Sequence, residues 1–203
     1  MEEIFRKKNL NTQIYVWKMN SSYEDQIKNP LLNTDEIISA KELKNEKRKK
    51  EFLSSRIALK NIFNKELELK NNKSGKPFIK EAKHLSISHS SNFLAVAFGE
   101  ENIGIDIEKP QNRMVKLMPK ILSELEFMEF KKEPSIDLAC KLWGAKEAIL
   151  KYVGDKNLNY KEDIKVENIE LGIATYLKMG FKVEFEKIEN MILTYVVRSN
   201  KLE

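Results

Sequence analysis

The order of helical and strand-like segments is the feature that most constrains the fold of this 203-residue chain. An opening strand is predicted over 13–19, where β-forming residues cluster. A helical pattern over 39–63 then precedes short strands at 78–80, 85–90 and 93–98. A second helical pattern over 136–152 precedes strands at 164–166, 182–185 and 191–197. Strands that alternate with single long helices in this way predict an α+β protein.

The repeated order also predicts a boundary near the middle of the chain. We expect residues 1–101 to form an N-terminal half and residues 102–203 to form a C-terminal half. The C-terminal half begins with a strand over 103–107, and the section 114–150 is helical with an interruption near Pro134. No residue-level repeat relates the halves, and no linker rich in glycine, serine or proline separates them, so we expect one packed unit.

Composition limits the class of protein and its compartment. Hydrophobic residues make up 41% and charged residues 33%, which is typical of a globular protein. No apolar run approaches the roughly 20 residues of a membrane helix, and the first residues lack the apolar core of a signal peptide. The single cysteine, Cys140, cannot form an internal disulfide, and its apolar neighbours indicate a core position. We therefore expect a cytoplasmic protein with no membrane partner.

The charge permits a polyanionic partner but does not identify one. A net charge of +5 suits nucleic acid, an acidic protein or a phosphorylated ligand, although much of it can be ordinary surface. No zinc-ligand cluster, helix-turn-helix signal or aromatic RNA-binding signature is present, so we expect no nucleic acid. Only two histidines occur, which excludes a histidine-rich metal site.

Two carboxylates interrupt the predicted strand that opens the C-terminal half. Because strand side chains alternate between faces, Asp106 and Glu108 project together while Ile105 and Ile107 face the core. Adjacent carboxylates repel each other without a cation between them, and oxygen ligands suit Mg²⁺. Ordinary acids on a solvent-facing strand give the same pattern, so the motif alone leaves both interpretations open.

The second long helix carries further charged residues at helical spacing. Four side chains lie on one side of it: Trp143, Glu147, Leu150 and Lys151. Lys146 borders this stripe, so Glu147 could supply a third carboxylate while Lys146 and Lys151 contact phosphates. The alternative is an amphipathic helix with a Glu147–Lys151 salt bridge worth roughly 0.3–0.5 kcal/mol. We expect Trp143 to lie in the core.

Two other polar segments in the N-terminal half have open roles. His89 stands at a strand end without an obvious Asp–His–Ser arrangement, so a cationic or hydrogen-bonding role toward a phosphate fits better than a hydrolase triad. The basic run over 44–50 is either an exposed helix face or a phosphate contact.

Four short segments carry a family resemblance when they are taken in order. They are Gly75-Lys76-Pro77, Ile87-Ser88-His89-Ser90, Gly104-Ile105-Asp106-Ile107-Glu108 and Trp143-Gly144-Ala145-Lys146-Glu147-Ala148-Ile149-Leu150-Lys151. The set resembles the G-K-P, S-H-S, G-(I/V)-D-x-E and W-x-x-K-E-(A/S)-x-x-K patterns of 4′-phosphopantetheinyl transferases of the Sfp (surfactin-synthetase-activating) type. Each motif is weak alone, but four in order with family-like spacing are specific. The resemblance runs from about residue 39 to about residue 165.

The resemblance implies a fold, ligands and residue roles. The fold would be a pseudo-dimer of two similar α/β halves, with coenzyme A and Mg²⁺ (or Mn²⁺) in the cleft between them. Asp106, Glu108 and Glu147 would be the metal ligands. Glu147 would also act as general base, directly or through water, and Lys151 would stabilise or protonate the leaving phosphate. The residues implied to bind coenzyme A are Arg48, Gly75, Lys76, Pro77, Ser88, His89, Asp106, Lys146 and Lys151.

The sequence departs from the family pattern in two places. A G-x-G-L turn commonly follows the second helix, but here Lys156 replaces the second glycine and Leu158 lies one position later. An arginine often closes the motif of the first helix where Lys60 stands, so the charge is kept but the bidentate geometry is lost. Arg48 is one candidate for the basic residue of the first helix, because Lys47, Lys49 and Lys50 compete for the same role.

The activity implied is the Mg²⁺-dependent transfer of 4′-phosphopantetheine from coenzyme A to a serine of an apo acyl or peptidyl carrier protein, with adenosine 3′,5′-bisphosphate as second product. The carrier is expected to be acidic, and the enzyme a monomer. Residues 113–133 would dock the carrier, although most apolar side chains there are expected to be core. The alternatives are a non-catalytic basic module that binds nucleic acid or an acidic protein, and a degenerate transferase that binds coenzyme A without turnover.

Overall fold

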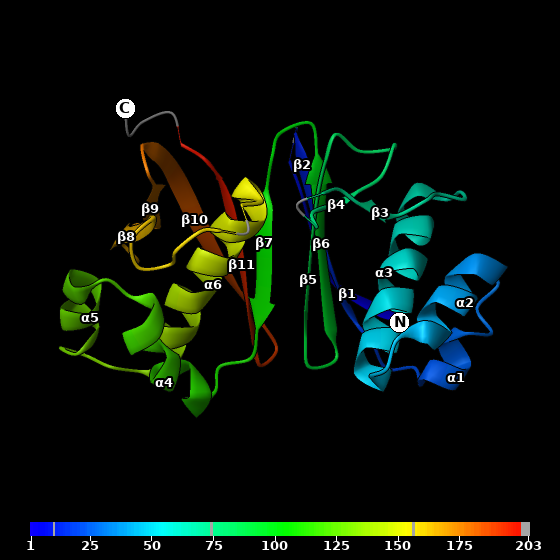
Figure 1. Cartoon of the computed structure of the whole chain (residues 1–203), viewed down its shortest axis with the longest axis horizontal. Coiled ribbons are helices and arrows are strands. Elements are labelled where there is room, and N and C mark those ends of the chain that lie inside the picture. Colours follow the sequence, from blue (N-terminus) through cyan, green and yellow to red (C-terminus); the bar gives the residue numbers. More distant parts are fainter. Residues whose placement is uncertain (10, 74, 156, 200–203) are drawn as a thin grey trace.

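Two large antiparallel sheets, a two-stranded sheet of β3 and β4, and the helices that cover the large sheets form the structure (Figure 1). The computed structural model describes residues 1–9, 11–73, 75–155 and 157–199. A four-stranded sheet with the order β1-β2-β6-β5 belongs to the N-terminal part, and a five-stranded sheet with the order β7-β11-β10-β9-β8 belongs to the C-terminal part. The mixed helix and sheet content agrees with the predicted α+β class.

The elements of the N-terminal part come first in the chain. Its strands are β1 (Glu2–Lys8), β2 (Thr12–Lys18), β3 (Lys70–Asn71), β4 (Pro77–Phe78), β5 (His84–Ser90) and β6 (Phe93–Gly99). Its helices are α1 (Tyr23–Gln26), α2 (Thr34–Glu42) and α3 (Glu46–Phe63). The single helix predicted over 39–63 is therefore wrong. The helical backbone is interrupted between α2 and α3, where Leu43 is extended and the Asn45 side chain caps α3.

The elements of the C-terminal part follow in the chain. Its helices are α4 (Asn112–Ile121), α5 (Glu124–Phe130) and α6 (Ile136–Val153). Its strands are β7 (Gly104–Glu108), β8 (Ile164–Asn168), β9 (Ile173–Tyr176), β10 (Met179–Ile188) and β11 (Met191–Arg198). The long helix over 136–152 and the strands β7, β8, β10 and β11 of this part were predicted. Strand β9 was not predicted, and neither was β1 of the N-terminal part. Within the described ranges, no helix is both long enough and apolar enough to cross a bilayer.

Alternating side chains place the two sheets face to face. In β2, Ile14 and Val16 point into a core that they share with Ile105 and Ile107 of β7. The intervening residues of each sheet face outward, where α3 covers the N-terminal sheet and α6 covers the C-terminal sheet. Figure 1 shows the resulting order of layers, with α4 and α5 outside α6.

The edges of the two sheets meet along β5 and β7, and serine side chains make the connection. The Ile105 N–H donates to Ser86 Oγ at 3.1 Å, and the Ile107 N–H donates to Ser88 Oγ at 3.3 Å. Both serines are buried, so their hydroxyls satisfy backbone donors that a neighbouring strand would otherwise satisfy. This seam brings the N-terminal part directly against the strand that carries the two carboxylates.

Candidate active site

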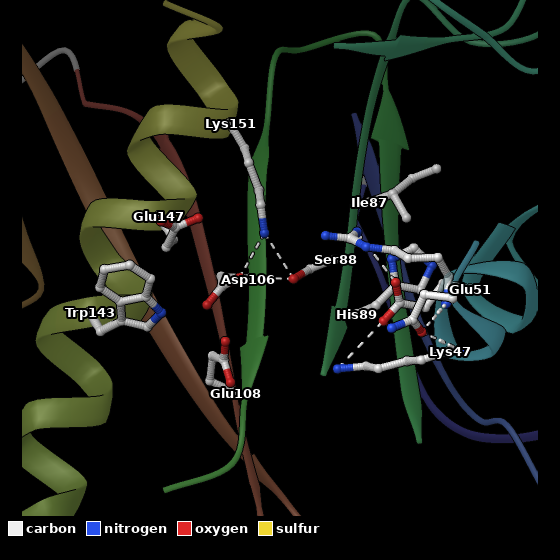
Figure 2. A pocket seen from close by; sticks show the side chains of 12 residues that line it. Lys47, Glu51, Ile87, Ser88, His89, Asp106, Glu108, Trp143, Glu147 and Lys151 are labelled. Atoms are coloured by element: carbon white, nitrogen blue, oxygen red, sulfur yellow. Dashed lines mark hydrogen bonds and ion pairs between the residues drawn. The ribbon is translucent and has the colours of Figure 1, made fainter. Parts of the chain in front are cut away.

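A cavity of about 370 Å³ opens along this seam, between α3 and β5 on one side and β7 and α6 on the other (Figure 2). It is lined by Asn45, Lys47, Arg48, Glu51, Ile87, Ser88, His89, Asp106, Glu108, Trp143, Glu147 and Lys151. Most of these are residues that the sequence singled out. The structure therefore brings the predicted D-x-E strand, the helix stripe, Arg48 and the Ser88-His89 segment to one place.

Asp106 is the centre of the cavity wall. Its side chain is 4% exposed. Oδ1 accepts hydrogen bonds from Ser88 Oγ at 2.8 Å and from Lys151 Nζ at 2.7 Å. Oδ2 is buried and has no hydrogen-bond partner among the described residues. A buried carboxylate oxygen without a partner is costly, so this atom marks a place for a ligand.

The other two carboxylates lie beside Asp106. Burial raises the pKa of Glu108, the Ser90 hydroxyl bonded at 2.7 Å lowers it, and the charge of Asp106 raises it. Burial also raises the pKa of Glu147. The Tyr160 hydrogen bond and the charge of Lys151 lower this pKa, and the charges of Asp106 and Glu108 add smaller upward contributions. The three acids thus repel one another in a partly dry site, and a cation between them would relieve this repulsion.

Close packing of α6 on β7 and on the neighbouring strand β11 produces this arrangement. A Cβ added at Gly104 of β7 would lie 1.9 Å from the carbonyl oxygen of Ala148, and a Cβ at Gly144 would lie 2.5 Å from Oγ1 of Thr194 on β11. Glycine at both positions lets the helix approach the two strands. As Figure 2 shows, Trp143, Glu147 and Lys151 then point from α6 toward the carboxylates of β7.

The helix stripe differs from the expected one in its ion pairing. Lys151 pairs with Asp106 across the cavity wall instead of forming the intrahelical bridge to Glu147. Trp143 is half-buried and lines the cavity instead of lying wholly in the core. Cys140 is buried, as expected, and burial raises the pKa of its thiol to about 12, so it is not a nucleophile.

His89 lies on the opposite wall and is neutral. Its Nε2 makes a 2.9 Å hydrogen bond with Ser55 Oγ. Burial, with a further contribution from the charge of Lys151, lowers its pKa to about 3. The expected cationic role is therefore wrong, because the ring carries no charge at neutral pH, while the hydrogen-bonding role stays open.

The described residues contain no group of three or more His, Cys, Asp or Glu side chains placed to hold a metal ion. The nitrogen of Lys151 lies where a cation would neutralise Asp106. The donor set nevertheless fits a hard divalent cation, because Asp106 Oδ2 lacks a partner and Glu108 and Glu147 add carboxylate oxygens on the same side.

A second cavity, of about 430 Å³, continues from the first. Ile87 and Lys151 line both cavities, and the predicted Gly75-Lys76-Pro77 turn lines the second. Lys76 Nζ donates to Asn102 Oδ1 at 2.9 Å and to the Tyr152 carbonyl at 3.0 Å. This lysine thus ties the turn of the N-terminal part to the end of α6. Lys156, the departure noted after α6, lies outside the described residues.

Lys146 does not join the site, and its expected phosphate contact is wrong for this structure. The side chain is fully buried. Its Nζ donates to Glu126 Oε2 at 3.0 Å, to the Tyr160 carbonyl at 2.8 Å and to the Ile164 carbonyl at 2.7 Å. All three protons of the ammonium are used, so Lys146 fastens α6 to α5, to the loop after α6 and to β8.

Tyr160 is a site residue that the sequence did not reveal. It lies in the loop after α6, its hydroxyl donates to Glu147 Oε1, and its ring centre lies 5.7 Å from that of Trp143. It also lines the second cavity. A tyrosine 13 positions after the glutamate has no helical or strand periodicity with it, so only the tertiary fold identifies this contact.

Comparison with known proteins adds a family to this geometry. Residues 102–189 match the 4′-phosphopantetheinyl transferase superfamily. The chain is 31% identical over 101 residues to 4′-phosphopantetheinyl transferase gsp of Aneurinibacillus migulanus, which covers 48% of this chain and 43% of that protein. It is 33% identical over 85 residues to 4′-phosphopantetheinyl transferase Sfp of Bacillus subtilis (strain 168), which covers 39% of this chain and 38% of that protein.

These matches confirm the resemblance inferred from the four motifs. The matched segment includes β7, α6 and therefore all three carboxylates. The chain spans about two fifths of the length of the curated relatives it matches.

Proposed function

We propose that this chain is a 4′-phosphopantetheinyl transferase, because residues 102–189 match that superfamily and form one wall of the cavity described above. It would transfer the 4′-phosphopantetheine group of coenzyme A to a serine of an apo carrier protein and release adenosine 3′,5′-bisphosphate. The observation that carries the proposal is the buried, partnerless Oδ2 of Asp106 beside two further carboxylates and a lysine.

We infer that the two halves, 1–101 and 102–203, are related as a pseudo-dimer with the site between them. The supporting feature is their topology. In each half a strand is followed by a long helix and an antiparallel hairpin, and the last strand pairs with the first: β2-β6-β5 in one sheet and β7-β11-β10 in the other. The motifs then come from both halves, with β5 on one wall and β7 and α6 on the other.

Asp106, Glu108 and Glu147 would hold Mg²⁺ or Mn²⁺. When bound, the metal would offset the charge that develops on the pyrophosphate oxygens of coenzyme A. The chain's own residues would position the substrates, which supplies most of the acceleration in phosphoryl chemistry. Arg48, His89, Ser88 and the turn that carries Lys76 would bind coenzyme A from the N-terminal half, although Lys76 and Ser88 already have partners in this structure.

Glu147 and Lys151 would handle the protons of the reaction. Glu147 would accept the proton of the carrier serine, directly or through a water, as the serine oxygen forms a bond to the phosphorus that carries pantetheine. The bond from this phosphorus to the bridging oxygen breaks, and the electron pair stays with adenosine 3′,5′-bisphosphate. Lys151 would leave Asp106 to stabilise or protonate that leaving phosphate.

The carrier would dock on residues 113–133, the section that contains most of α4 and all of α5. Met114, Met118 and Ile121 are buried, so they are core residues as preferred from the sequence. Two apolar side chains of α5 are exposed instead, Leu125 at 77% and Met128 at 55%. An acidic carrier would complement the positive charge of the chain. The cytoplasmic compartment and the monomeric state expected for this protein stay predictions.

The test is the reaction itself. The protein is incubated with coenzyme A, Mg²⁺ and a panel of apo acyl and peptidyl carrier proteins, and each carrier is weighed by mass spectrometry. We expect at least one carrier to gain the mass of one phosphopantetheine group, and the gain to disappear with Asp106→Asn or with chelator. Glu186→Gln, which changes a half-buried acid of β10 paired with Lys7 of β1, is the control and should leave the reaction intact.

Two other results would overturn the proposal. No mass gain on any carrier, together with coenzyme A binding, would indicate a degenerate transferase. No mass gain together with strongly salt-dependent binding to RNA or DNA that survives Asp106→Ala would indicate the basic binding module.

A further inference from the structure

Apart from one contact, Glu147 is the least constrained of the three carboxylates. Among the described residues, Asp106 is paired with Lys151 and Glu108 with Arg113, but no ion pair holds Glu147. A glutamate has several rotatable bonds, and like charges beside it favour rotamers that point away. The hydroxyl of Tyr160, which donates to Oε1, is the group that opposes this tendency.

We propose that Tyr160 is a positioning residue that fixes the Glu147 carboxylate for metal binding and proton transfer, an inference that rests on the proposed function. The hydrogen bond engages Oε1 and leaves Oε2 for the metal or for the proton of the carrier serine. Partners of this kind orient ligands of metals, and their loss costs about 10- to 100-fold in metal affinity or activity.

Tyr160 can act in this way because two contacts hold it. Its carbonyl accepts a hydrogen bond from the fully buried Lys146 at 2.8 Å. Its ring packs against the ring of Trp143, with centres 5.7 Å apart. Lys146 is itself fastened to Glu126 and to the Ile164 carbonyl. The loop after α6 is therefore anchored at the residue whose hydroxyl reaches the site.

This arrangement gives Lys146 a role that replaces the expected phosphate contact. Lys146 and Glu147 are neighbours on α6, yet one points into the core and the other into the cavity. The first holds the backbone of Tyr160 and the second receives its hydroxyl. The adjacent Lys-Glu pair thus secures both ends of one tyrosine.

The experiment compares wild type with Tyr160→Phe, which keeps the ring that packs on Trp143 and removes only the hydroxyl. Binding of Mn²⁺ is measured by electron paramagnetic resonance without coenzyme A, and transfer to a responsive carrier is measured by mass spectrometry. We expect Mn²⁺ affinity and kcat each to fall about 10- to 100-fold. The KM for coenzyme A should change less than kcat, because the phenylalanine ring keeps the surface that Tyr160 presents to the second cavity.

Tyr15→Phe is the matched control. The Tyr15 hydroxyl also donates to a single side chain, Gln13 Oε1 at 2.9 Å, but on the N-terminal sheet. This variant should bind Mn²⁺ and turn over like wild type.

A double-mutant cycle separates positioning from a general structural role. If Tyr160 acts through Glu147, Tyr160→Phe should weaken Mn²⁺ binding in wild type but not in a Glu147→Gln background. An equal loss in both backgrounds, or wild-type Mn²⁺ affinity and kcat in Tyr160→Phe, would overturn the inference. Absence of transfer by the wild-type protein would instead overturn the proposed function, and Mn²⁺ binding would still decide the role of Tyr160.

Discussion

At the level of single residues, the Lys151 ammonium has two positions, one in the structure and one in the proposed reaction. In the structure its ammonium lies 2.7 Å from Asp106 Oδ1 and 2.8 Å from Ser88 Oγ. The proposed reaction needs the same ammonium at the leaving phosphate and needs a divalent cation at Asp106. Lysine and metal therefore compete for one carboxylate, and coenzyme A would favour the metal by attracting the lysine away.

This competition predicts the effect of Lys151→Met. Without coenzyme A, the variant should bind Mn²⁺ about tenfold more tightly than wild type, equivalent to about 1.4 kcal/mol, because a competing cation is gone. Transfer activity should nevertheless fall sharply. Titration calorimetry at mildly alkaline pH measures the affinity. Lys132→Met, which removes an exposed lysine paired with Glu129, should leave the affinity unchanged. Unchanged or weaker binding by Lys151→Met would show that the lysine does not occupy the metal's place.

His89 gives a second residue-scale prediction, on pH and stability. Its folded-state pKa of about 3 lies below the ordinary 6.5, so the unfolded chain binds the extra proton first as pH falls. The stability that the neutral ring contributes is present above about pH 6.5 and is lost progressively toward pH 3. Between about pH 7 and about pH 5 this one group should cost about 2 kcal/mol of unfolding free energy.

Urea denaturation at both pH values measures this loss. His89→Gln should remove most of it, whereas His84→Gln, which removes the other histidine, should leave most of it in place. An identical pH dependence in wild type and His89→Gln would contradict the buried, neutral state of the ring.

The residues of the site differ in how far the sequence could place them. The two-residue period of a strand directed Asp106 and Glu108 to one face without any knowledge of the tertiary fold. Lys146 and Glu147 are adjacent in a helix, and which of them enters the cavity depends on where α5 and the loop after α6 pack. The buried contacts of Lys146 with Glu126 and Tyr160 therefore could not be read from the motif.

At the level of elements, the contact of α6 with β7 and β11 determines the site. Gly104 of β7 faces the backbone carbonyl of Ala148, and Gly144 faces the side chain of Thr194 on β11. A methyl group at either position must separate helix from strand or displace its neighbour. The two clashes differ in kind, because a side chain can be shortened and a backbone carbonyl cannot.

A second substitution at Thr194 should therefore restore the stability lost through alanine at one of the two glycines but not at the other. Gly144→Ala should destabilise the protein by about 1–3 kcal/mol, even though alanine favours a helix by about 1 kcal/mol over glycine. Adding Thr194→Ala removes the oxygen at 2.5 Å and leaves Thr194 Cβ at 3.2 Å, so most of the loss should be recovered. Urea denaturation measures both variants.

Gly104→Ala is the comparison for that pair. Its methyl group would meet a carbonyl oxygen at 1.9 Å, so the loss should be larger and Thr194→Ala should not restore it. Equal, small effects at both glycines would mean that α6 does not pack as closely on β7 and β11 as the structure describes.

The prediction of helices and strands was more reliable where the apolar residues follow a single period. Strands β2, β6 and β11 and helix α6 were predicted because their apolar residues repeat regularly. Strand β1 was missed, since five of the seven residues of Glu2–Lys8 are charged and only Ile4 and Phe5 pack against the shared core. A peripheral strand of this kind is recognised only once its partner β2 is in place.

At the level of the whole molecule, the two large sheets share one core. Ile14 and Val16 of β2 pack in the same cluster as Ile105 and Leu193 of the other sheet, and all four are buried. The serine contacts between β5 and β7 close the seam. Either half alone would expose this apolar face to water, which favours unfolding of the whole chain in one step.

The two tryptophans can test this, because each belongs to a different half. Trp17 is 5% exposed in the core under α3, and Trp143 lies on α6 beside the cavity. In Trp143→Phe the fluorescence reports the N-terminal half, and in Trp17→Phe it reports the C-terminal half. Within each variant, the fluorescence and the far-ultraviolet circular dichroism should give the same urea midpoint, because loss of either half exposes the shared core. A fluorescence transition separate from the circular dichroism transition in either variant would show that the halves unfold independently, and the seam would then be a docking surface between two units.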